Sequence, residues 1–314
     1  MVGYIYADGA SAAAPAEIGL VILDKDGCLL DFNPTWLPGL RECAHRTAAE
    51  AGEPGLEPAL LKAGGWIEDE AGGARIARDG LMLHAPLEEI AQAWIDTQPM
   101  IASHFENDVG RLTSLLEGIL MSTTVRDATP LGPVDATLRR LHAAGIKLAV
   151  VTNDQEAVAK AQFARLGWDA LFCKIIGADS GYGGKPDPGG VRAAIESAGV
   201  VASDAIMVGD SEGDLVAGKR AGCAFTIAIH PDSTPLPAGL AGAACRMPHI
   251  GPIPDVLETV SGRRPQGSMA TPGGRQSCPT PTAAQLRAAA AASEAAAAAA
   301  AAVDPDVIAM VDGL

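Results

Sequence analysis

Residues 19–27 read Gly-Leu-Val-Ile-Leu-Asp-Lys-Asp-Gly, and this stretch decides the fold. Its apolar run is short, rich in branched residues and closed by polar ones, which is typical of a strand buried on both faces of a parallel sheet. The same pattern returns four times further along the chain. These runs are residues 146–152, 172–176, 205–210 and 224–230. The sequence therefore predicts five strands of a parallel sheet.

Helix-length segments separate the later strands. Residues 133–144 place Val134 and Leu138 on one helical face and end before a glycine. Residues 154–166 and 187–198 likewise end before a glycine. A regular alternation of strand and helix is typical of a doubly wound sheet. We therefore expect an α/β fold with a doubly wound parallel sheet.

The segment 32–127 interrupts this alternation directly after the first strand. It contains amphipathic helical stretches punctuated by glycines and no convincing strand, so we expect a mainly helical cap domain. The expected tail is flexible and has no catalytic part, because it is rich in Gly, Pro and Ala. The expected divisions are an N-terminal extension (1–17), an α/β core (18–31 and 128–255), the helical cap (32–127) and the tail (256–314).

Composition excludes several classes of protein. The formal net charge of −15 opposes binding to nucleic acid, whose phosphates require a basic surface. No apolar run is long enough to predict a membrane span, and the first residues do not resemble a signal peptide. Six scattered cysteines without a CxxC pair are typical of reduced thiols. We expect a cytoplasmic protein without a nucleic-acid or membrane partner, and its oligomeric state stays open.

Polar residues that can carry chemistry lie where the predicted strands end. This position matters because ligands of an open parallel sheet bind at the carboxyl ends of its strands. Asp24 and Asp26 lie two residues apart before a glycine, so both carboxylates can face one point. Lys185 lies in a loop between glycines and prolines, which fixes its position. The other candidates are Thr152, Asn153, Asp210 and Asp214.

Each of these features also has a simpler interpretation. The aspartate pair fits an ordinary polar turn, and Thr152 with Asn153 fits a helix cap. Lys185 fits a solvated surface residue, and residues 209–214 fit a capped loop entering a helix. Their joint occurrence in this order favours chemistry instead. A nucleophilic acid, an acid/base, a hydroxyl, a cation and a carboxylate site suited to Mg²⁺ together suit phosphoryl transfer.

In this order the motifs resemble those of the haloacid-dehalogenase-like (HAD) hydrolase superfamily. Residues 24–27 are similar to its first motif and Thr152 to its second. Lys185 is similar to the third motif, and residues 209–214 are similar to the fourth. The resemblance covers residues 18–232 and is greatest to the phosphoglycolate-phosphatase-type branch, in which a helical cap follows the first motif. It implies a HAD-like Rossmannoid core with a helical cap.

The resemblance also implies a role for each candidate residue. Asp24 would be the nucleophile that becomes an aspartyl phosphate, and Asp26 would protonate the leaving alkoxide and then activate water. Thr152, Asn153 and Lys185 would bind the transferring phosphoryl group. The implied function is a Mg²⁺-dependent phosphatase that acts on a small phosphate monoester, either phosphoglycolate-like or a sugar phosphate. The implied ligands of Mg²⁺ are Asp24, the Asp26 carbonyl, Asp210 and Asp214.

Two residues depart from the family pattern. Cys28 replaces a common threonine at a position that supports the loop, and Lys25 replaces an apolar residue. We interpret Lys25 as a surface lysine, with added positive potential near the substrate entrance as the alternative. Arg75 and Arg78 could bind a substrate carboxylate, although solvated side chains are the simpler interpretation.

Other functions compete with a phosphatase. A phosphomutase of the same superfamily shares all four motifs and differs by keeping water away from the site. A dehalogenase has no use for an acid at Asp26, which disfavours that reaction. A non-catalytic binding or scaffold protein has no reason to combine Asp24, Asp26 and Lys185. The phosphatase is therefore favoured, with the phosphomutase and the binding protein as alternatives, and the sequence does not identify the substrate.

Overall fold

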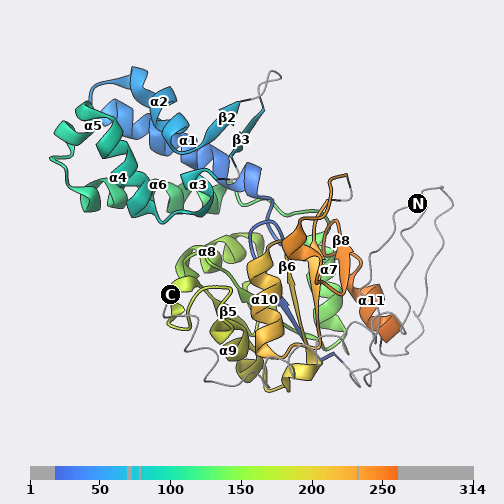
Figure 1. Cartoon of the computed structure of the whole chain (residues 1–314). Helices are drawn as coiled ribbons and strands as arrows, with labels where there is room; N and C mark the ends of the chain where they lie inside the picture. Colours follow the sequence, from blue (N-terminus) through green and yellow to red (C-terminus); the bar gives the residue numbers. More distant parts are fainter. Residues whose placement is uncertain (1–17, 69–72, 78, 232, 261–314) are drawn as a thin grey trace, which may run out of the picture. The chain divides into compact units, whose positions relative to one another are not determined.

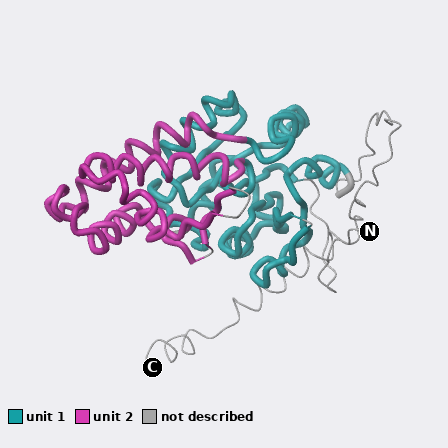
Figure 2. Tube along the Cα trace, turned by 90° about the horizontal axis from the view of Figure 1, so that it is seen from above, with its two compact units in different colours: residues 1–29, 130–314 teal, residues 30–129 magenta. Residues whose placement is uncertain are grey.

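Two compact units make up the chain, which is described by a computed structural model (Figure 1). The first unit runs up to Leu29 and continues from Pro130, whereas the second is the inserted segment Leu30–Thr129 (Figure 2). The structure describes residues 18–68, 73–77, 79–231 and 233–260.

A six-stranded parallel sheet forms the centre of the first unit, in the order β5-β4-β1-β6-β7-β8. All four residues of β1 are buried, as expected for a strand covered on both faces. The predicted α/β class with a doubly wound parallel sheet is confirmed. The strands are β1 (Leu20–Leu23), β4 (Lys147–Val151), β5 (Lys174–Ile176), β6 (Ala205–Gly209), β7 (Phe225–Ile229) and β8 (Cys245–Met247).

Helices cover both faces of this sheet. Leu20 and Ile22 pack in one apolar cluster with Val191 of α9, so the alternate residues Val21 and Leu23, which are also buried, face the other side. Helices α9 and α10 contact each other, and α7 contacts β4 and α11. The helices of this unit are α7 (Val134–Ala143), α8 (Glu156–Leu166), α9 (Gly189–Ala198), α10 (Glu212–Ala221) and α11 (Ile253–Val260), with 3₁₀ turns η2 (Asp169–Leu171), η3 (Ala178–Ser180), η4 (Ala202–Asp204) and η5 (Ala238–Leu240).

The ends of three neighbouring strands meet at one edge of the sheet. Leu23 at the end of β1 is in register with Val150 of β4 and Val208 of β6. The N–H of Asp24 donates to the carbonyl oxygen of Val208 at 2.9 Å, which continues the pairing to the last position before the loop. Residues that follow β1, β4 and β6 therefore start from adjacent points.

The second unit is a helical bundle with a short hairpin. Helices α1 and α6 pack against each other. Trp94 is wholly buried in the core of the unit, and its indole N–H donates to the carbonyl oxygen of Leu60 at 2.9 Å. The elements are α1 (Phe32–Glu50), η1 (Pro54–Leu56), α2 (Glu57–Ala63), β2 (Trp66–Glu68), β3 (Ala74–Ile76), α3 (Leu81–His84), α4 (Leu87–Thr97), α5 (Pro99–His104) and α6 (Val109–Arg126).

Three short strands were not predicted. The expectation of no strand within 32–127 is wrong, because Trp66 pairs with Ile76 in the antiparallel hairpin β2–β3. Strand β8 is also absent from the sequence-based prediction. Each of these strands has only three residues and one of them is charged, so none forms a continuous apolar run.

The expected start of the tail at residue 256 is also wrong. Helix α11 continues to Val260 and buries Val256 and Leu257. Arg140 of α7 pairs with Asp255 and with Glu258 of this helix, each at 2.7 Å. The rest of the expected tail and the N-terminal extension lie outside the described residues.

Hydrogen bonds join the two segments that connect the units. The N–H of Leu131 donates to the carbonyl oxygen of Leu29 at 2.9 Å. The N–H of Asp31 donates to the carbonyl oxygen of Thr129 at 2.8 Å. The outgoing and returning segments therefore run side by side where the insertion begins and ends.

Candidate active site

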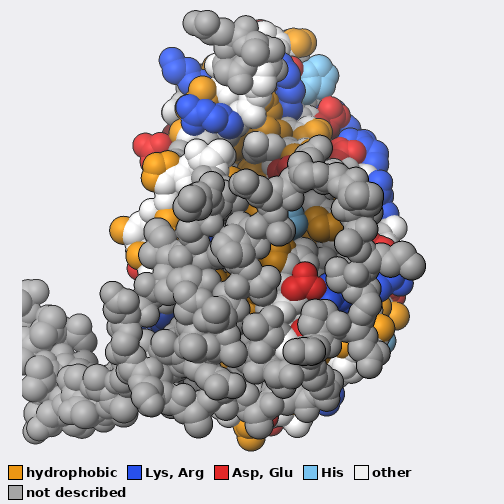
Figure 3. Space-filling view, turned by 90° about the vertical axis from the view of Figure 1, so that its right-hand side faces the viewer, with side chains coloured by type: hydrophobic (Ala, Val, Ile, Leu, Met, Phe, Trp, Pro, Cys, Tyr) orange, Lys and Arg blue, Asp and Glu red, His pale blue; other side chains and the backbone are white. Residues whose placement is uncertain are grey.

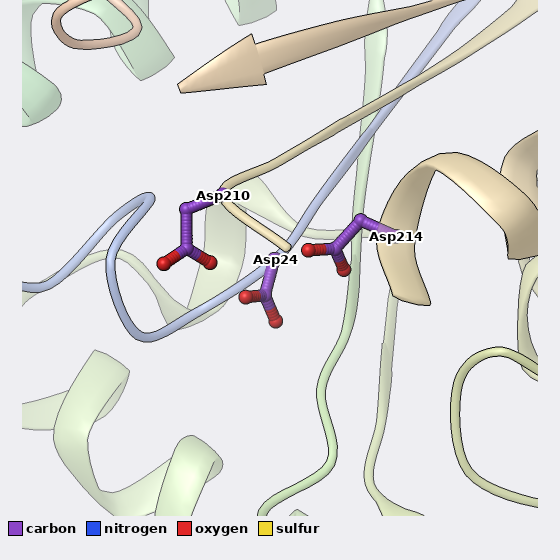
Figure 4. Close-up of side chains that lie close together, drawn as sticks. All are labelled: Asp24, Asp210 and Asp214. Carbon is purple, nitrogen blue, oxygen red and sulfur yellow. The ribbon is translucent and has the colours of Figure 1, made fainter. Parts of the chain in front are cut away.

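Three carboxylates lie together at the carboxyl edge of the sheet. Asp24 follows β1, Asp210 follows β6, and Asp214 lies in the first turn of α10. One oxygen of each lies within 4.8 Å of the others, and Figure 4 shows the three groups directed toward one another. Asp24 and Asp214 are buried, whereas Asp210 is exposed. Solvent therefore reaches the cluster at Asp210.

Lys185 bridges two of these carboxylates. Its Nζ lies 2.5 Å from Oδ1 of Asp24 and 2.5 Å from Oδ1 of Asp214. The backbone of Lys185 is held by Asn153, whose Oδ1 accepts from the Lys185 N–H at 2.8 Å. The Asn153 amide Nδ2 donates to the Lys185 carbonyl oxygen at 3.0 Å. The ammonium is therefore fixed between the nucleophile candidate and α10.

Asp214 is fixed by the start of its own helix. Its Oδ2 accepts from the backbone N–H of Ser211 at 2.9 Å and from the Ser211 hydroxyl at 2.6 Å. The Ser211 hydroxyl in turn accepts from the Asp214 N–H, which completes a capping box. One oxygen of Asp214 thus serves the helix cap and the other faces Lys185.

Glycines allow the carboxylates to approach the backbone. A Cβ on Gly209 would lie 2.2 Å from Cγ of Asp214, and a Cβ on Gly27 would lie 2.2 Å from Oδ2 of Asp210. Gly27 also has a φ of +73°, a left-handed conformation that side-chain-bearing residues rarely adopt. Only glycine fits these two positions without displacing a carboxylate.

The carboxylates have raised pKa values. Burial raises the pKa of Asp24 to about 7, and Asp214 adds to this effect while Lys185 opposes it. Although Asp210 has exposed surface, the protein atoms packed around it remove part of its hydration and raise its pKa to about 8, with further contributions from Asp24 and Asp214. Burial would lower the pKa of Lys185, but Asp24 and Asp214 raise it above its usual value. The lysine alone therefore does not balance the negative charge of the cluster.

This donor set fits a hard divalent cation. The cluster offers carboxylate oxygens, which Mg²⁺ prefers in proteins. A divalent cation would lower the raised pKa values of Asp24 and Asp210 and hold both groups ionised. Asp24, Asp210 and Asp214 are therefore suited to hold such a cation.

Lys25 is not a surface residue. Its side chain is fully buried, and its Nζ lies 2.7 Å from Oδ2 of Asp26 and 3.0 Å from Oδ2 of Asp154. The expectation of a surface lysine is therefore wrong. The ammonium also cannot add potential at a substrate entrance directly, since two carboxylates surround it. The side chain of Asp26 remains 24% exposed, so it is open to solvent beside this pair.

The N–H groups that begin α8 are occupied by side chains. The hydroxyl oxygen of Thr152 accepts from the N–H of Asp154 at 3.1 Å, and Asp154 Oδ1 accepts from Gln155 N–H at 2.7 Å. Asp179 Oδ1 accepts from Glu156 N–H at 2.8 Å. An anion would have to displace these partners to bind there. The Thr152 hydroxyl still has its own proton to donate.

Comparison with known proteins gives the family. The family model of haloacid dehalogenase-like hydrolases matches residues 18–222, which is more than half of the chain. The chain belongs to this family of hydrolases. The predicted superfamily is therefore confirmed.

Two relatives each match about two thirds of this HAD-like hydrolase. The phosphoglycolate phosphatase of Rhodospirillum rubrum is 32% identical over 209 residues, which cover 64% of this chain and 76% of that protein. The phosphoglycolate phosphatase of Vibrio cholerae is 28% identical over 213 residues, which cover 66% of this chain and 82% of that protein. The predicted branch of the superfamily is confirmed by these relatives.

Solved structures share the fold. A HAD-superfamily hydrolase of subfamily IA from Geobacter sulfurreducens aligns with a TM-score of 0.55 at 21% identity, over 79% of this chain and all of that chain. A predicted phosphoglycolate phosphatase from Haemophilus somnus aligns with a TM-score of 0.53 at 20% identity, over 76% of this chain and 97% of that one. At this identity the likeness concerns the fold alone.

Two residues of the HAD-like hydrolase were missed by the sequence analysis. Ser211 caps α10 and orients Asp214, and the Ser-x-x-Asp spacing from 211 to 214 is the signal that could have shown it. Asp154 pairs with Lys25, a contact that no local pattern reveals, because the two residues lie on different loops.

The described part of the surface carries charges of both signs. On the face in Figure 3, the described Lys and Arg side chains are interspersed with Asp and Glu.

Arg75 is exposed on β3, and Arg78 lies outside the described residues. Among the described residues, none of the helices has the length and apolar character that crossing a membrane requires.

Proposed function

We propose that this hydrolase is a Mg²⁺-dependent phosphatase that cleaves a small phosphate monoester through an aspartyl phosphate on Asp24. The observation that carries the proposal is the arrangement of Asp24. Lys185 holds one oxygen of Asp24, and Asp24 lies within a carboxylate cluster. Asp26 follows two residues later in the chain. A nucleophile, a charge-balancing ammonium and an acid/base are thus assembled at one edge of the sheet.

The metal site would consist of Asp24, Asp210, Asp214 and the backbone carbonyl of Asp26. Bound Mg²⁺ would offset negative charge on the transferring phosphoryl group. Asp214 already serves the α10 cap and Lys185, so we assign it a supporting place beside the other two carboxylates.

In the first half-reaction, the carboxylate of Asp24 attacks phosphorus and the ester oxygen leaves. Lys185 holds Oδ1 of Asp24, which leaves Oδ2 for the attack. Asp26 donates a proton to the departing alkoxide. The Thr152 hydroxyl and the Lys185 ammonium stabilise charge on the transferring group. The products are the free alcohol and a phosphoryl group on Asp24.

In the second half-reaction, water cleaves the aspartyl phosphate. Asp26, now ionised, takes a proton from the water as its oxygen attacks phosphorus. The bond between phosphorus and the Asp24 oxygen breaks, which restores the carboxylate and releases inorganic phosphate. Asn153 supports both steps through the backbone of Lys185.

We assign the substrate to small phosphate esters, phosphoglycolate-like or a sugar phosphate. The support is that the relatives from Rhodospirillum rubrum and Vibrio cholerae are phosphoglycolate phosphatases. We place the protein in the cytoplasm. All cysteines among the described residues are free thiols, which suits a reducing compartment.

The test is phosphate release by the purified full chain. We expect 2-phosphoglycolate or a sugar phosphate from a panel of esters to release inorganic phosphate with Mg²⁺, and release to stop when a chelator is added. Asp24→Asn is the matched control, since it keeps the shape of the side chain and removes the nucleophile. Turnover that persists in the chelator, or in Asp24→Asn, contradicts the proposal. Isomerisation of a sugar phosphate without net phosphate release would indicate a phosphomutase.

A further inference from the structure

The ammonium of Lys25 is fully buried beside the site. Its side chain has no exposed surface, although it lies between Asp24 and Asp26 in the chain. A buried ammonium is tolerated only when carboxylates or other acceptors compensate for the lost hydration. The contacts that Lys25 makes therefore have to be kept in the folded protein.

Lys25 joins two loops. Asp26 belongs to the loop after β1, and Asp154 belongs to the segment between β4 and α8. The Nζ of Lys25 contacts Oδ2 of each, at 2.7 Å and 3.0 Å. The opposite oxygen of Asp154 accepts from the N–H of Gln155. The start of a helix thus fixes Asp154. Because the Lys25 ammonium contacts both Asp154 and Asp26, it also limits the movement of Asp26.

The two lysines near the site have parallel tasks. Lys185 bridges Asp24 and Asp214, whereas Lys25 bridges Asp26 and Asp154. Lys185 is thus directed at the proposed nucleophile, and Lys25 at the proposed acid/base. An ammonium with its donors on two carboxylates restricts the rotation of both.

We propose that Lys25 is a positioning residue that holds the Asp26 carboxylate in the orientation needed for proton transfer. It acts through Asp26 and does not touch the substrate, since it is fully buried. The role rests on the proposed function, in which Asp26 serves as acid and base. If the Asp26 carboxylate loses its orientation, the reaction should slow most for esters whose leaving group needs a proton. A misplaced catalytic group can cost about 100-fold in rate.

The test compares Lys25→Met with wild type on two phosphate esters in the presence of Mg²⁺. For an alkyl phosphate, whose leaving group needs a proton, we expect kcat to fall by about 10- to 100-fold with KM nearly unchanged. For an aryl phosphate with a good leaving group, the rate of the leaving-group burst, which reports the first half-reaction, should fall several-fold less. Steady-state turnover of this ester is not the readout, because the second half-reaction also needs Asp26. Lys25→Arg should recover part of the loss. Lys160→Met is the control, because Lys160 forms an exposed ion pair with Glu156.

A double variant decides between positioning and general damage. In an Asp26→Asn background, Lys25→Met should cause no further selective loss on the alkyl ester, since the group it orients is no longer an acid. An equal fall in the alkyl kcat and in the aryl burst rate, or the same loss with and without Asp26, would overturn the role of Lys25. Wild-type protein that hydrolyses no phosphate ester would overturn the proposed function itself. The two failures are therefore distinct.

Folding is followed by circular dichroism and thermal melting. If Lys25→Met does not fold, Lys25→Arg and Asp154→Asn decide. Asp154→Asn keeps the oxygen that caps Gln155 and removes the charge that anchors Lys25. It should show the same preference for loss on the alkyl ester, with a smaller magnitude. An Asp154→Asn variant in which the alkyl kcat and the aryl burst rate fall equally contradicts the proposal.

Discussion

The side-chain amide of Asn153 pairs with the backbone of Lys185 through two hydrogen bonds, one donated at 3.0 Å and one accepted at 2.8 Å. The residue held in this way carries the ammonium that bridges Asp24 and Asp214. Asn153 is itself exposed. Its contribution therefore lies in the position of Lys185.

Replacing Asn153 by alanine should lower kcat and stability together. Each lost hydrogen bond is worth about 1 kcal/mol of unfolding free energy. Displacement of the ammonium should lower kcat by about 10- to 100-fold. The control is Gln155→Ala, two residues further along, whose side chain does not cap the helix. The measurements are kcat and the midpoint of thermal unfolding, and wild-type values of kcat for Asn153→Ala contradict the assignment.

Asp24→Asn and Asp26→Asn should fail in different ways. Asp24→Asn removes the attacking carboxylate, so neither phosphoenzyme nor product should form. Asp26→Asn keeps the nucleophile but removes a proton donor that contributes about 10²- to 10⁴-fold. With an aryl phosphate it should give a burst of leaving group, then slow turnover, and intact-mass analysis should find one added phosphoryl group. If Asp26→Asn hydrolyses alkyl phosphates at the wild-type rate, the assigned role is wrong.

Mg²⁺ binding should release protons and strengthen as the pH rises. The pKa of Asp24 is about 7 and that of Asp210 about 8, so both groups hold protons in the metal-free protein below these values. Their raised pKa values stabilise the metal-free fold at acid pH, and this stability is lost as the pH rises toward 8. Thermal shifts measured with Mg²⁺ and with a chelator should therefore differ more at pH 8 than at pH 6. Asp210→Asn should flatten this dependence, and a constant difference in the wild type contradicts it.

Gly27→Ala and Gly167→Ala form a matched pair. Both glycines have positive φ, +73° and +70°, so each alanine should cost roughly 1–2 kcal/mol of stability. The new Cβ at residue 27 meets Asp210 at 2.2 Å, whereas at residue 167 it meets nothing within 4 Å. Only Gly27→Ala should therefore weaken Mg²⁺ binding and activity. Titration of Mg²⁺ against activity checks this, and equal Mg²⁺ dependence of the two variants speaks against it.

A chain that ends at residue 260 should keep its turnover, whereas one that ends at residue 252 should be destabilised. The chain that ends at residue 260 retains α11, which buries Ile253, Val256 and Leu257 and pairs with Arg140. Loss of three buried apolar side chains costs several kcal/mol, at about 1.5–3 kcal/mol each. The measurements are kcat and the thermal midpoint. Loss of activity in a folded chain ending at 260 contradicts the view that the remaining tail has no catalytic part.

Much of the fold could be predicted because its sheet is buried on both faces. Such strands give continuous apolar runs, and the polar residues that follow them identify the edge where ligands bind. The sequence therefore predicts Asp24, Asp210 and Lys185 as neighbours. The structure brings these residues together around Asp214.

The remainder depends on contacts between residues far apart in the sequence. The burial of Lys25 follows from its pairing with Asp154, which lies beyond the whole inserted unit. A lysine beside two aspartates has the same local sequence whether it is buried or exposed. The hairpin around Trp66 and Ile76 is too short to leave a pattern. Contacts that form only in the folded chain determine both the burial of Lys25 and this hairpin.

The paired segments at Leu29 and Leu131 bear on how such a protein can evolve. Because the chain leaves and returns through neighbouring, hydrogen-bonded segments, the ends of the inserted unit are already close to each other. A segment with adjacent ends can be lengthened, shortened or exchanged for another without changing the register of β1, β4 and β6. Mutation and recombination can therefore diversify the insert while the sheet edge that carries Asp24 is inherited intact.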